Sequence, residues 1–166
     1  LMAEDEGAVE TFSAPYLSQF QQAQNLLRKF DPLLASINQQ NEYLEEVRIY
    51  TYYGLKNSRS YILDAAAASG TEARYLQCGG EPAWVYADGK LAVSAKLLNF
   101  ENLENAATVT FLIDREDFFR ECLPNWTWDY SFGVYDREGR EIYSQEQIRD
   151  SKDCGKAELL TQSSTL

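Results

Sequence analysis

The chain has 166 residues and a formal net charge of −11 at pH 7, with 45% hydrophobic and 13% aromatic residues. This size suits one domain, or one domain with a fragment of a second, and the hydrophobic content is sufficient for a core. The acidic balance argues against nucleic acid and against an anionic membrane surface, because both require a basic surface. We therefore expect neither as a partner.

The sequence contains no histidine. This excludes Ser-His and Cys-His nucleophile pairs, imidazole acid–base catalysis and the commonest metal ligand. The three cysteines, Cys78, Cys122 and Cys154, lie far apart and follow no zinc-binding spacing. We expect no metal and no cofactor, and the odd number permits at most one disulfide within the chain.

No window reaches the roughly 20 apolar residues of a membrane span. No signal peptide is visible either, because acidic residues follow Leu1-Met2-Ala3 at once. The chain starts with Leu rather than Met. We therefore expect a piece of a longer protein whose membrane spans lie outside this sequence.

A heptad pattern covers residues 16–44, where apolar residues recur in alternating steps of four and three and predict a long helix. Asp31-Pro32 interrupts the pattern without changing its register. Asp31 is expected to cap a new helix and Pro32 suits its first position, so we predict a helix kinked or restarted near residue 31. The helix either packs only on its own domain or also forms a homodimer contact. The apolar seam consists of Tyr16, Phe20, Ala23, Leu27, Phe30, Leu34, Ile37 and Leu44.

The segment after the helix alternates between strand and helix signals. Residues 47–53 are β-branched and aromatic, which predicts a strand with Arg48 and Tyr50 on one face. Ser58 or Ser60 is expected to begin a short helix through Ala68, which Gly70 ends. Residues 71–82 are expected to form a loop.

The Asp88-Gly89 pair predicts a β-hairpin with strands over residues 83–87 and 90–98, because both central residues of a type I′ turn need a positive φ. A polar connection over residues 99–107 leads to a strand over 108–113. Asp114 is then expected to cap a helix, with Asp117 completing a short capping box. Pro124 ends that helix.

A second hairpin is predicted near the C-terminus, with a strand over residues 132–135, a turn over 136–139 and a return strand over 141–144. Residues 145–166 are polar and show no core pattern. Successive hairpins favour an antiparallel sheet with helices on one side of it. The predicted fold class is therefore α+β, with the long N-terminal helix packed on a central antiparallel sheet.

Catalysis is poorly supported by the sequence. Carboxylate pairs such as Glu45-Glu46 and Glu116-Asp117 are expected in helical, solvated positions as ordinary surface. No glycine loop suitable for a phosphate is present. A hydrolase that uses two carboxylates across a cleft remains the weakest alternative, and we expect the chain not to be an enzyme.

Aromatic residues with a few charges on neighbouring strands give a stronger signal. Tyrosine and tryptophan combine ring area with a hydrogen-bonding tip, which suits sugars and small organic ligands. The competing interpretation is a packed sheet face, in which buried cations would need partners. We predict that Trp84 and Tyr86 line a cavity with Tyr50 or Arg48 and with Lys96. The candidate ligand-binding residues are Arg48, Tyr50, Tyr52, Tyr61, Tyr75, Trp84, Tyr86 and Lys96.

Trp126 and Trp128 form a second aromatic pair with period-two spacing. One interpretation is a packed junction with whatever follows the first sheet. The other is an exposed platform for carbohydrate. The alternative function is therefore a carbohydrate-binding module that uses these two rings.

Four segments taken together resemble a known family. They are the run Asn41 to Tyr50, the segment Pro82 to Tyr86, the strand Leu91 to Leu97, and the run Thr108 to Asp114 followed by Phe118-Phe119. Their order and spacing resemble the extracytoplasmic sensor region of YesM-type bacterial sensor histidine kinases. Those regions look like Cache domains, the extracellular relatives of PAS domains. The phosphoaccepting histidine and the ATP-binding domain of such a kinase are absent from this sequence.

The resemblance implies three parts: a signalling helix over residues 1–45, a Cache-like sensor over 46–124, and a hairpin and tail over 125–166 that begin a membrane-proximal module. It also implies a position on the extracellular side of a bacterial cell membrane, reached only through spans missing from this sequence. Such a domain would bind a small molecule, a sugar or an amino-acid-like compound, between the sheet and its covering loop. The long helix would transmit the signal.

Overall fold

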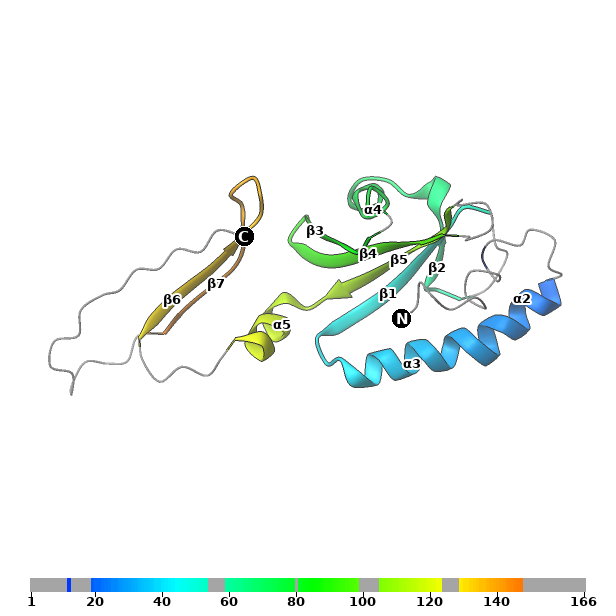
Figure 1. The fold of residues 1–166 in the computed structure, drawn as a ribbon, viewed down its shortest axis with the longest axis horizontal. Coiled ribbons are helices and arrows are strands. Elements are labelled where there is room, and N and C mark those ends of the chain that lie inside the picture. Colours follow the sequence, from blue (N-terminus) through cyan, green and yellow to red (C-terminus); the bar gives the residue numbers. More distant parts are fainter. Residues whose placement is uncertain are drawn as a thin grey trace, which may run out of the picture.

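The structure is a computed structural model that describes residues 12, 19–53, 59–79, 81–98, 105–123 and 129–147. It is an α+β fold, as expected (Figure 1). Its helical elements are α2 (Gln19–Asn25), a π-helical turn (Leu26–Phe30), α3 (Asp31–Gln40), a 3₁₀ turn (Ala65–Ala67), α4 (Thr71–Tyr75) and α5 (Arg115–Cys122). Its strands are β1 (Leu44–Thr51), β2 (Ile62–Asp64), β3 (Ala83–Ala87), β4 (Lys90–Leu98), β5 (Asn105–Ile113), β6 (Tyr130–Tyr135) and β7 (Glu141–Gln147).

The main sheet has five strands in the order β2-β1-β5-β4-β3. Pairing is antiparallel except between β1 and β2, which run parallel. The prediction of an antiparallel sheet was therefore wrong at one edge, and the sheet is mixed. β2 runs in the same direction as Ile49–Thr51, the last residues of β1, so these two consecutive strands do not form the hairpin that an antiparallel sheet would need there.

Helices cover both faces of this sheet, whereas the sequence pattern predicted helices on one side. Figure 1 shows the long helix along one face and α4 over the other. The face toward the long helix, here the α3 face, carries a core of Val47, Ile49 and Val109 with Phe30 and Leu34. The opposite α4 face carries a second core of Tyr50, Ala65, Tyr75, Ala92 and Leu112.

The hairpin at Asp88-Gly89 was predicted correctly, with strands over residues 83–87 and 90–98. Asp88 and Gly89 have φ angles of 51° and 77°, as a type I′ turn requires. The strands at 47–53 and 108–113 were also predicted, but β1 begins earlier, at Leu44, and β5 begins earlier, at Asn105.

The segment between residues 58 and 82 differs from the prediction. In place of a helix through Ala68, Ile62–Asp64 form β2 and pair with Ile49–Thr51, and a 3₁₀ turn follows. The Asp64 carboxylate accepts a 2.9 Å hydrogen bond from the Ala66 amide and so caps that turn. The expected loop instead contains α4. Pairing with β1 outweighs the local helix preference of the alanine run.

The long helix is continuous through Asp31-Pro32, but it widens just before them. The Asp31 amide donates to the Leu26 carbonyl in a π-type bond, which supports the prediction of an irregularity near residue 31. A proline cannot donate to the helix and crowds the preceding turn, so a wider turn there relieves the conflict. Asp31 does not cap a helix, contrary to expectation.

The widened turn changes which side of the helix meets the sheet. Leu26, Phe30 and Leu34 are buried, whereas Phe20 and Leu27 are 70% and 63% exposed. The predicted seam therefore packs on the sheet only from Phe30 onward. Tyr16, the first residue of the predicted seam, lies outside the described residues.

Helix α5 begins as predicted, because the Asp114 carboxylate accepts a 3.0 Å hydrogen bond from the Asp117 amide. The reciprocal half of the predicted capping box is not formed. The Asp114 amide donates to the Tyr43 carbonyl at 2.8 Å, and the Asp117 carboxylate accepts from Arg120 at 2.6 Å. The second hairpin is confirmed as β6 and β7, with its turn at residues 136–139.

Asp31 uses its carboxylate to hold the long helix against the segment that leads into β2. It accepts from Arg59 Nη2 at 2.8 Å and from the Tyr61 hydroxyl at 2.5 Å. The hydrogen bond from Arg59 lowers the pKa of Asp31 despite its partial burial. Burial and the hydrogen bond to the Asp31 carboxylate raise the pKa of Tyr61.

We expect Asp31→Asn to lower the free energy of unfolding by about 1 kcal/mol at pH 7, since the ion pair is half-exposed. A carboxyl with a lowered native pKa stabilises above its unfolded value of about 4 and loses this effect as pH falls through the native value. The difference from wild type should therefore shrink below about pH 4 in urea titrations. Glu45→Gln, at an exposed position on β1, is the control, and a pH-independent difference for Asp31→Asn would contradict the anchor.

Candidate functional site

The pairing register decides which candidate residues lie together. Directly paired residues of an antiparallel sheet point to the same face. Arg48 pairs with Thr110, which pairs with Ser94. Tyr50 pairs with Thr108, which pairs with Lys96. These two rows place Arg48, Tyr50 and Lys96 on the α4 face.

Two further candidates join them there. Tyr75 belongs to α4 and is 1% exposed within the same core as Tyr50. The Tyr52 hydroxyl lies 2.9 Å from Thr108 Oγ1 at the end of the Tyr50 row. We call the polar side chains of this face the Arg48 cluster. It comprises Glu46, Arg48, Tyr50, Tyr52, Glu72, Tyr75, Ser94, Lys96, Thr108 and Thr110.

Arg48 is held by two acidic side chains. Its Nη2 atom donates to Glu46 at 2.8 Å and its Nη1 atom donates to Glu72 of α4 at 3.1 Å. The Glu46 hydrogen bond raises the pKa of Arg48, which stays fully charged. The third donor, Nε, is buried and has no hydrogen-bond partner among the described residues.

Tyr50 carries the second buried polar atom without a partner in the described part of the chain, its hydroxyl oxygen. The side chain is completely buried. Burial raises the pKa of Tyr50, and the nearby Arg48 guanidinium only partly opposes this shift. By contrast, the neighbouring Ser94 and Thr110 hydroxyls satisfy one another at 2.9 Å. A buried polar group without a partner costs about 1–3 kcal/mol, so two of them side by side call for an explanation.

Lys96 and Cys78 lie at the far end of this face. Burial raises the pKa of the Cys78 thiol, and the positive charge of Lys96 partly opposes this. Cys78 is buried and Cys122 is exposed, and both are free thiols. Cys154 lies outside the described residues.

The remaining three candidates lie on the α3 face, so the predicted cavity that joins Trp84 and Tyr86 to Tyr50, Arg48 and Lys96 does not form. Trp84 pairs with Val93, which pairs with Phe111 and through it with Val47, a residue of the α3-face core. Tyr86 shares the face of Trp84, as predicted. Tyr61 packs beside the long helix with Asp31.

The physical reason for this error is register. Alternation within one strand is local, but a shift of one residue between strands exchanges the two faces. The sequence correctly predicted that Trp84 and Tyr86 share one face of their strand, and that Arg48 and Tyr50 share one face of theirs. It could not tell whether the two pairs shared a side of the sheet.

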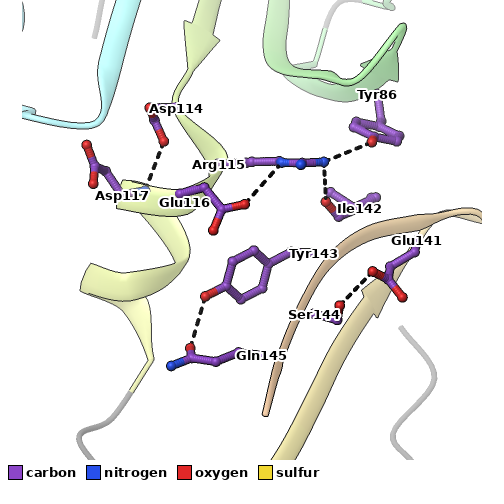
Figure 2. Close-up of polar contacts among 10 residues, drawn as sticks. All are labelled: Tyr86, Asp114, Arg115, Glu116, Asp117, Glu141, Ile142, Tyr143, Ser144 and Gln145. Atoms are coloured by element: carbon purple, nitrogen blue, oxygen red, sulfur yellow. Dashed lines mark hydrogen bonds and ion pairs between the residues drawn. The ribbon is translucent and has the colours of Figure 1, made fainter. Parts of the chain in front are cut away.

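Trp84 and Tyr86 instead meet α5 and the second hairpin. The Trp84 ring lies 5.5 Å from the Phe118 ring, and the Phe119 ring stacks on Tyr143 at 4.6 Å. Figure 2 shows Arg115 between β3 and the second hairpin. Its Nη1 atom donates to the Tyr86 hydroxyl and to the Ile142 carbonyl, both at 3.1 Å. A groove of about 850 Å³ runs between β3, α5 and the hairpin.

Sequence reasoning missed two acidic members of the Arg48 cluster. Glu46 was assigned to ordinary helical surface, but it lies on β1 and shares a face with Arg48. The spacing of two residues between Glu46 and Arg48 was the available signal, once the strand is extended to Leu44. Glu72 had no such signal, because it reaches Arg48 only through the position of α4.

The described residues contain no group of three or more acidic or cysteine side chains that could hold a metal ion. None of the helices in the described ranges combines the length and hydropathy that a membrane span requires. Trp126 and Trp128 lie outside the described residues, so the carbohydrate platform has no structural account here.

Comparison with known proteins adds no identity, since no protein-family model, curated protein or solved structure matches this chain.

We expect Tyr50→Phe to leave the free energy of unfolding unchanged or to raise it by up to about 1 kcal/mol, because the hydroxyl it removes has no hydrogen-bond partner in the described part of the chain. Thr110→Val is the matched control, since it removes a buried hydroxyl that is bonded to Ser94 and should destabilise by about 1–3 kcal/mol. Urea unfolding of both variants measures the contrast. A loss above about 1 kcal/mol for Tyr50→Phe would mean that its hydroxyl is partnered in the free protein.

Proposed function

We propose that this chain is the extracytoplasmic ligand-sensing domain of a bacterial membrane-bound sensor histidine kinase, with a Cache- or PAS-like fold. In this proposal the Arg48 cluster binds a small molecule and the long helix transmits occupancy. The observation that carries the proposal is a pair of buried polar atoms, Arg48 Nε and the Tyr50 hydroxyl oxygen, that have no hydrogen-bond partner among the described residues and lie on the face that α4 covers. A ligand oxygen would satisfy both.

The arrangement of the sheet supports the family assignment. The long helix packs against one face of a five-stranded sheet, as the resemblance implies. The resemblance also places the ligand between the sheet and the segment that covers it. In this chain that segment comprises the 3₁₀ turn at Ala65–Ala67 and α4.

The charges of the cluster favour a neutral or zwitterionic ligand. Two cations, Arg48 and Lys96, face two acids, Glu46 and Glu72, and both acids already pair with Arg48. An anion would therefore find its main partner largely neutralised. Tyr50 and Tyr75 add aromatic walls, which suit a sugar ring or the side chain of an amino acid.

Strand β1 connects the proposed ligand site to the long helix that would transmit its occupancy. Arg48 and Tyr50 face the cluster. Val47 and Ile49, which alternate with them along the strand, pack in the core that holds Phe30 and Leu34 of the helix. A ligand that shifts Arg48 would thus shift the strand on which the helix rests. For signalling, the ligand must bind one arrangement better than the other, because equal affinity for both shifts nothing.

A thermal-shift screen against sugars, amino acids and small carboxylates tests the ligand site. At a concentration 100-fold above Kd, a true ligand should stabilise by about 2.7 kcal/mol and raise Tm by about 5–10 °C. Tyr50→Phe and Arg48→Lys should abolish the shift, since each removes one of the two donors. Trp84→Ala should retain it, because Trp84 lies on the other face.

Two results would contradict this site. One is a ligand shift that Trp84→Ala abolishes and Tyr50→Phe retains, which would move binding to the α3 face or to the groove. The other is the absence of any ligand shift across the panel with wild-type protein. Because Tyr50→Phe is expected to be stable, loss of folding does not confuse its result.

We also propose that the N-terminal half of the long helix forms a homodimer contact. Phe20 and Leu27 are seven residues apart, two turns of helix, and are 70% and 63% exposed. Ala23 lies between them and is exposed as well. Apolar residues at heptad spacing on an open helix face are the pattern of a two-helix seam.

Leu27→Glu should therefore prevent self-association, because it places a charge in the seam. Sedimentation velocity over a range of protein concentrations is the measurement, and wild type should show a concentration-dependent dimer. Lys29→Glu, on an exposed position of the same helix outside the seam, should still dimerise. A wild-type protein that remains monomeric at high concentration would remove this contact from the proposal.

A further inference from the structure

The edge of the main sheet at β3 lacks the usual protection of exposed sheet edges. Natural edges are short, charged or covered, because unpaired amides and carbonyls recruit other strands. The opposite edge, β2, has three residues and includes Asp64. The β3 edge has five residues, Ala-Trp-Val-Tyr-Ala, without a charge.

The turn of the hairpin determines which backbone amides and carbonyls of β3 do not bond to β4. In a two-residue type I′ hairpin, the residues that flank the turn exchange hydrogen bonds, and bonded and non-bonded pairs alternate from there. Ala87 pairs with Lys90, so Val85 and Ala83 also bond to β4. The amides and carbonyls of Trp84 and Tyr86 therefore point away from β4. No hydrogen bond from the described residues reaches them.

These free groups open into the groove of about 850 Å³ between β3, α5 and the second hairpin. Its walls contain Phe118 and Phe119 of α5 and Val134 and Ile142 of the hairpin. Arg115 of α5 links β3 to the hairpin, because it donates to the Tyr86 hydroxyl and to the Ile142 carbonyl (Figure 2). The edge is thus a strand that forms one side of a groove with apolar walls. Such a shape accepts one extended segment.

The charge on the groove differs from that of the whole chain. Three arginines line it, Arg74, Arg137 and Arg140, against Asp136 and Glu138. Both acids already pair with Arg140 at 2.6 and 3.0 Å. Arg74 and Arg137 therefore give the groove a positive bias in a chain of net charge −11. Acidic side chains on the occupant would complement it.

We propose that this groove binds an extended peptide segment of a partner protein by strand addition to β3. The segment pairs its backbone with Trp84 and Tyr86, buries alternate side chains against Trp84 and α5, and directs acidic side chains toward Arg74 and Arg137. A second copy of this chain is the less suitable occupant, since its own β3 carries α5 and the hairpin with it. This site is separate from the Arg48 cluster and does not depend on the proposed sensor function.

A displayed library of nine-residue peptides, randomised at every position, tests the proposal with the whole chain as bait. Enriched peptides should alternate apolar and acidic residues and should contain no proline at the pairing positions. The affinity of one enriched peptide is then measured by fluorescence anisotropy. A library that yields no binder, or only proline-rich or amphipathic helical peptides, would overturn strand addition.

The backbone contribution is isolated by comparing Trp84→Pro with Trp84→Ala. Both remove the indole, but only proline removes the outward amide, and a proline is tolerated where an edge amide faces away from the sheet. Trp84→Pro should bind the peptide about tenfold more weakly than Trp84→Ala, because one peptide carbonyl then stays unpaired in the groove. Equal affinity of the two variants would overturn the proposal.

Amide hydrogen exchange followed by NMR gives a second readout that needs no variant. In the free protein the Trp84 and Tyr86 amides should exchange faster than those of Val85 and Ala87, which bond to β4. Saturating peptide should slow Trp84 and Tyr86 selectively. Slowing of these amides with rising protein concentration and no peptide would instead assign the edge to a second copy and overturn the peptide partner.

Discussion

The alternation of β1 is the constraint on which the rest of this structure depends. One strand supplies Val47 and Ile49 to the core under the long helix and Arg48 and Tyr50 to the opposite face. Since neighbouring side chains of a strand must point to opposite sides, neither face can be rearranged without moving the other. Within the ranges that the structure describes, the two buried side-chain atoms without hydrogen-bond partners belong to this same strand. The free-energy cost of burying these two atoms of Arg48 and Tyr50 is therefore offset by the helix packing that fixes β1 in place.

Short-range signals in the sequence, such as turn and capping residues, were sufficient to predict most of the strands. The turn at Asp88-Gly89 needs two positive φ angles, and the cap at Asp114 needs only an amide three residues away, so both follow from short-range geometry. The face shared by Trp84 and Tyr86 is equally local. The relation of that face to Arg48 depends on three successive registers, β3 with β4, β4 with β5 and β5 with β1, which no local signal contains.

The structure departs from the local sequence preference in two places. Ile62 and Leu63 became a strand because β1 had a free edge for them, although the alanines that follow favour helix. The long helix kept its direction through Pro32 because the π turn before it removed the conflict that would otherwise bend or end a helix. The wide π turn divides the apolar heptad positions of the helix into an exposed part at Phe20 and Leu27 and a buried part from Phe30 onward. The heptad spacing alone predicted one uniform face.

The two proposed sites lie on one face and at one edge of the same sheet, and β4 is the element they share. Ser94 and Lys96 of β4 face the Arg48 cluster, while the same strand holds β3 by the pairs that leave Trp84 and Tyr86 free at the edge. A peptide added to β3 would extend the ladder and restrain β4 from outside. A ligand that contacts Ser94 and Lys96 would restrain the same strand from its α4 face. Coupling of this kind must be reciprocal, so a ligand that selects the same arrangement would strengthen peptide binding by the same factor.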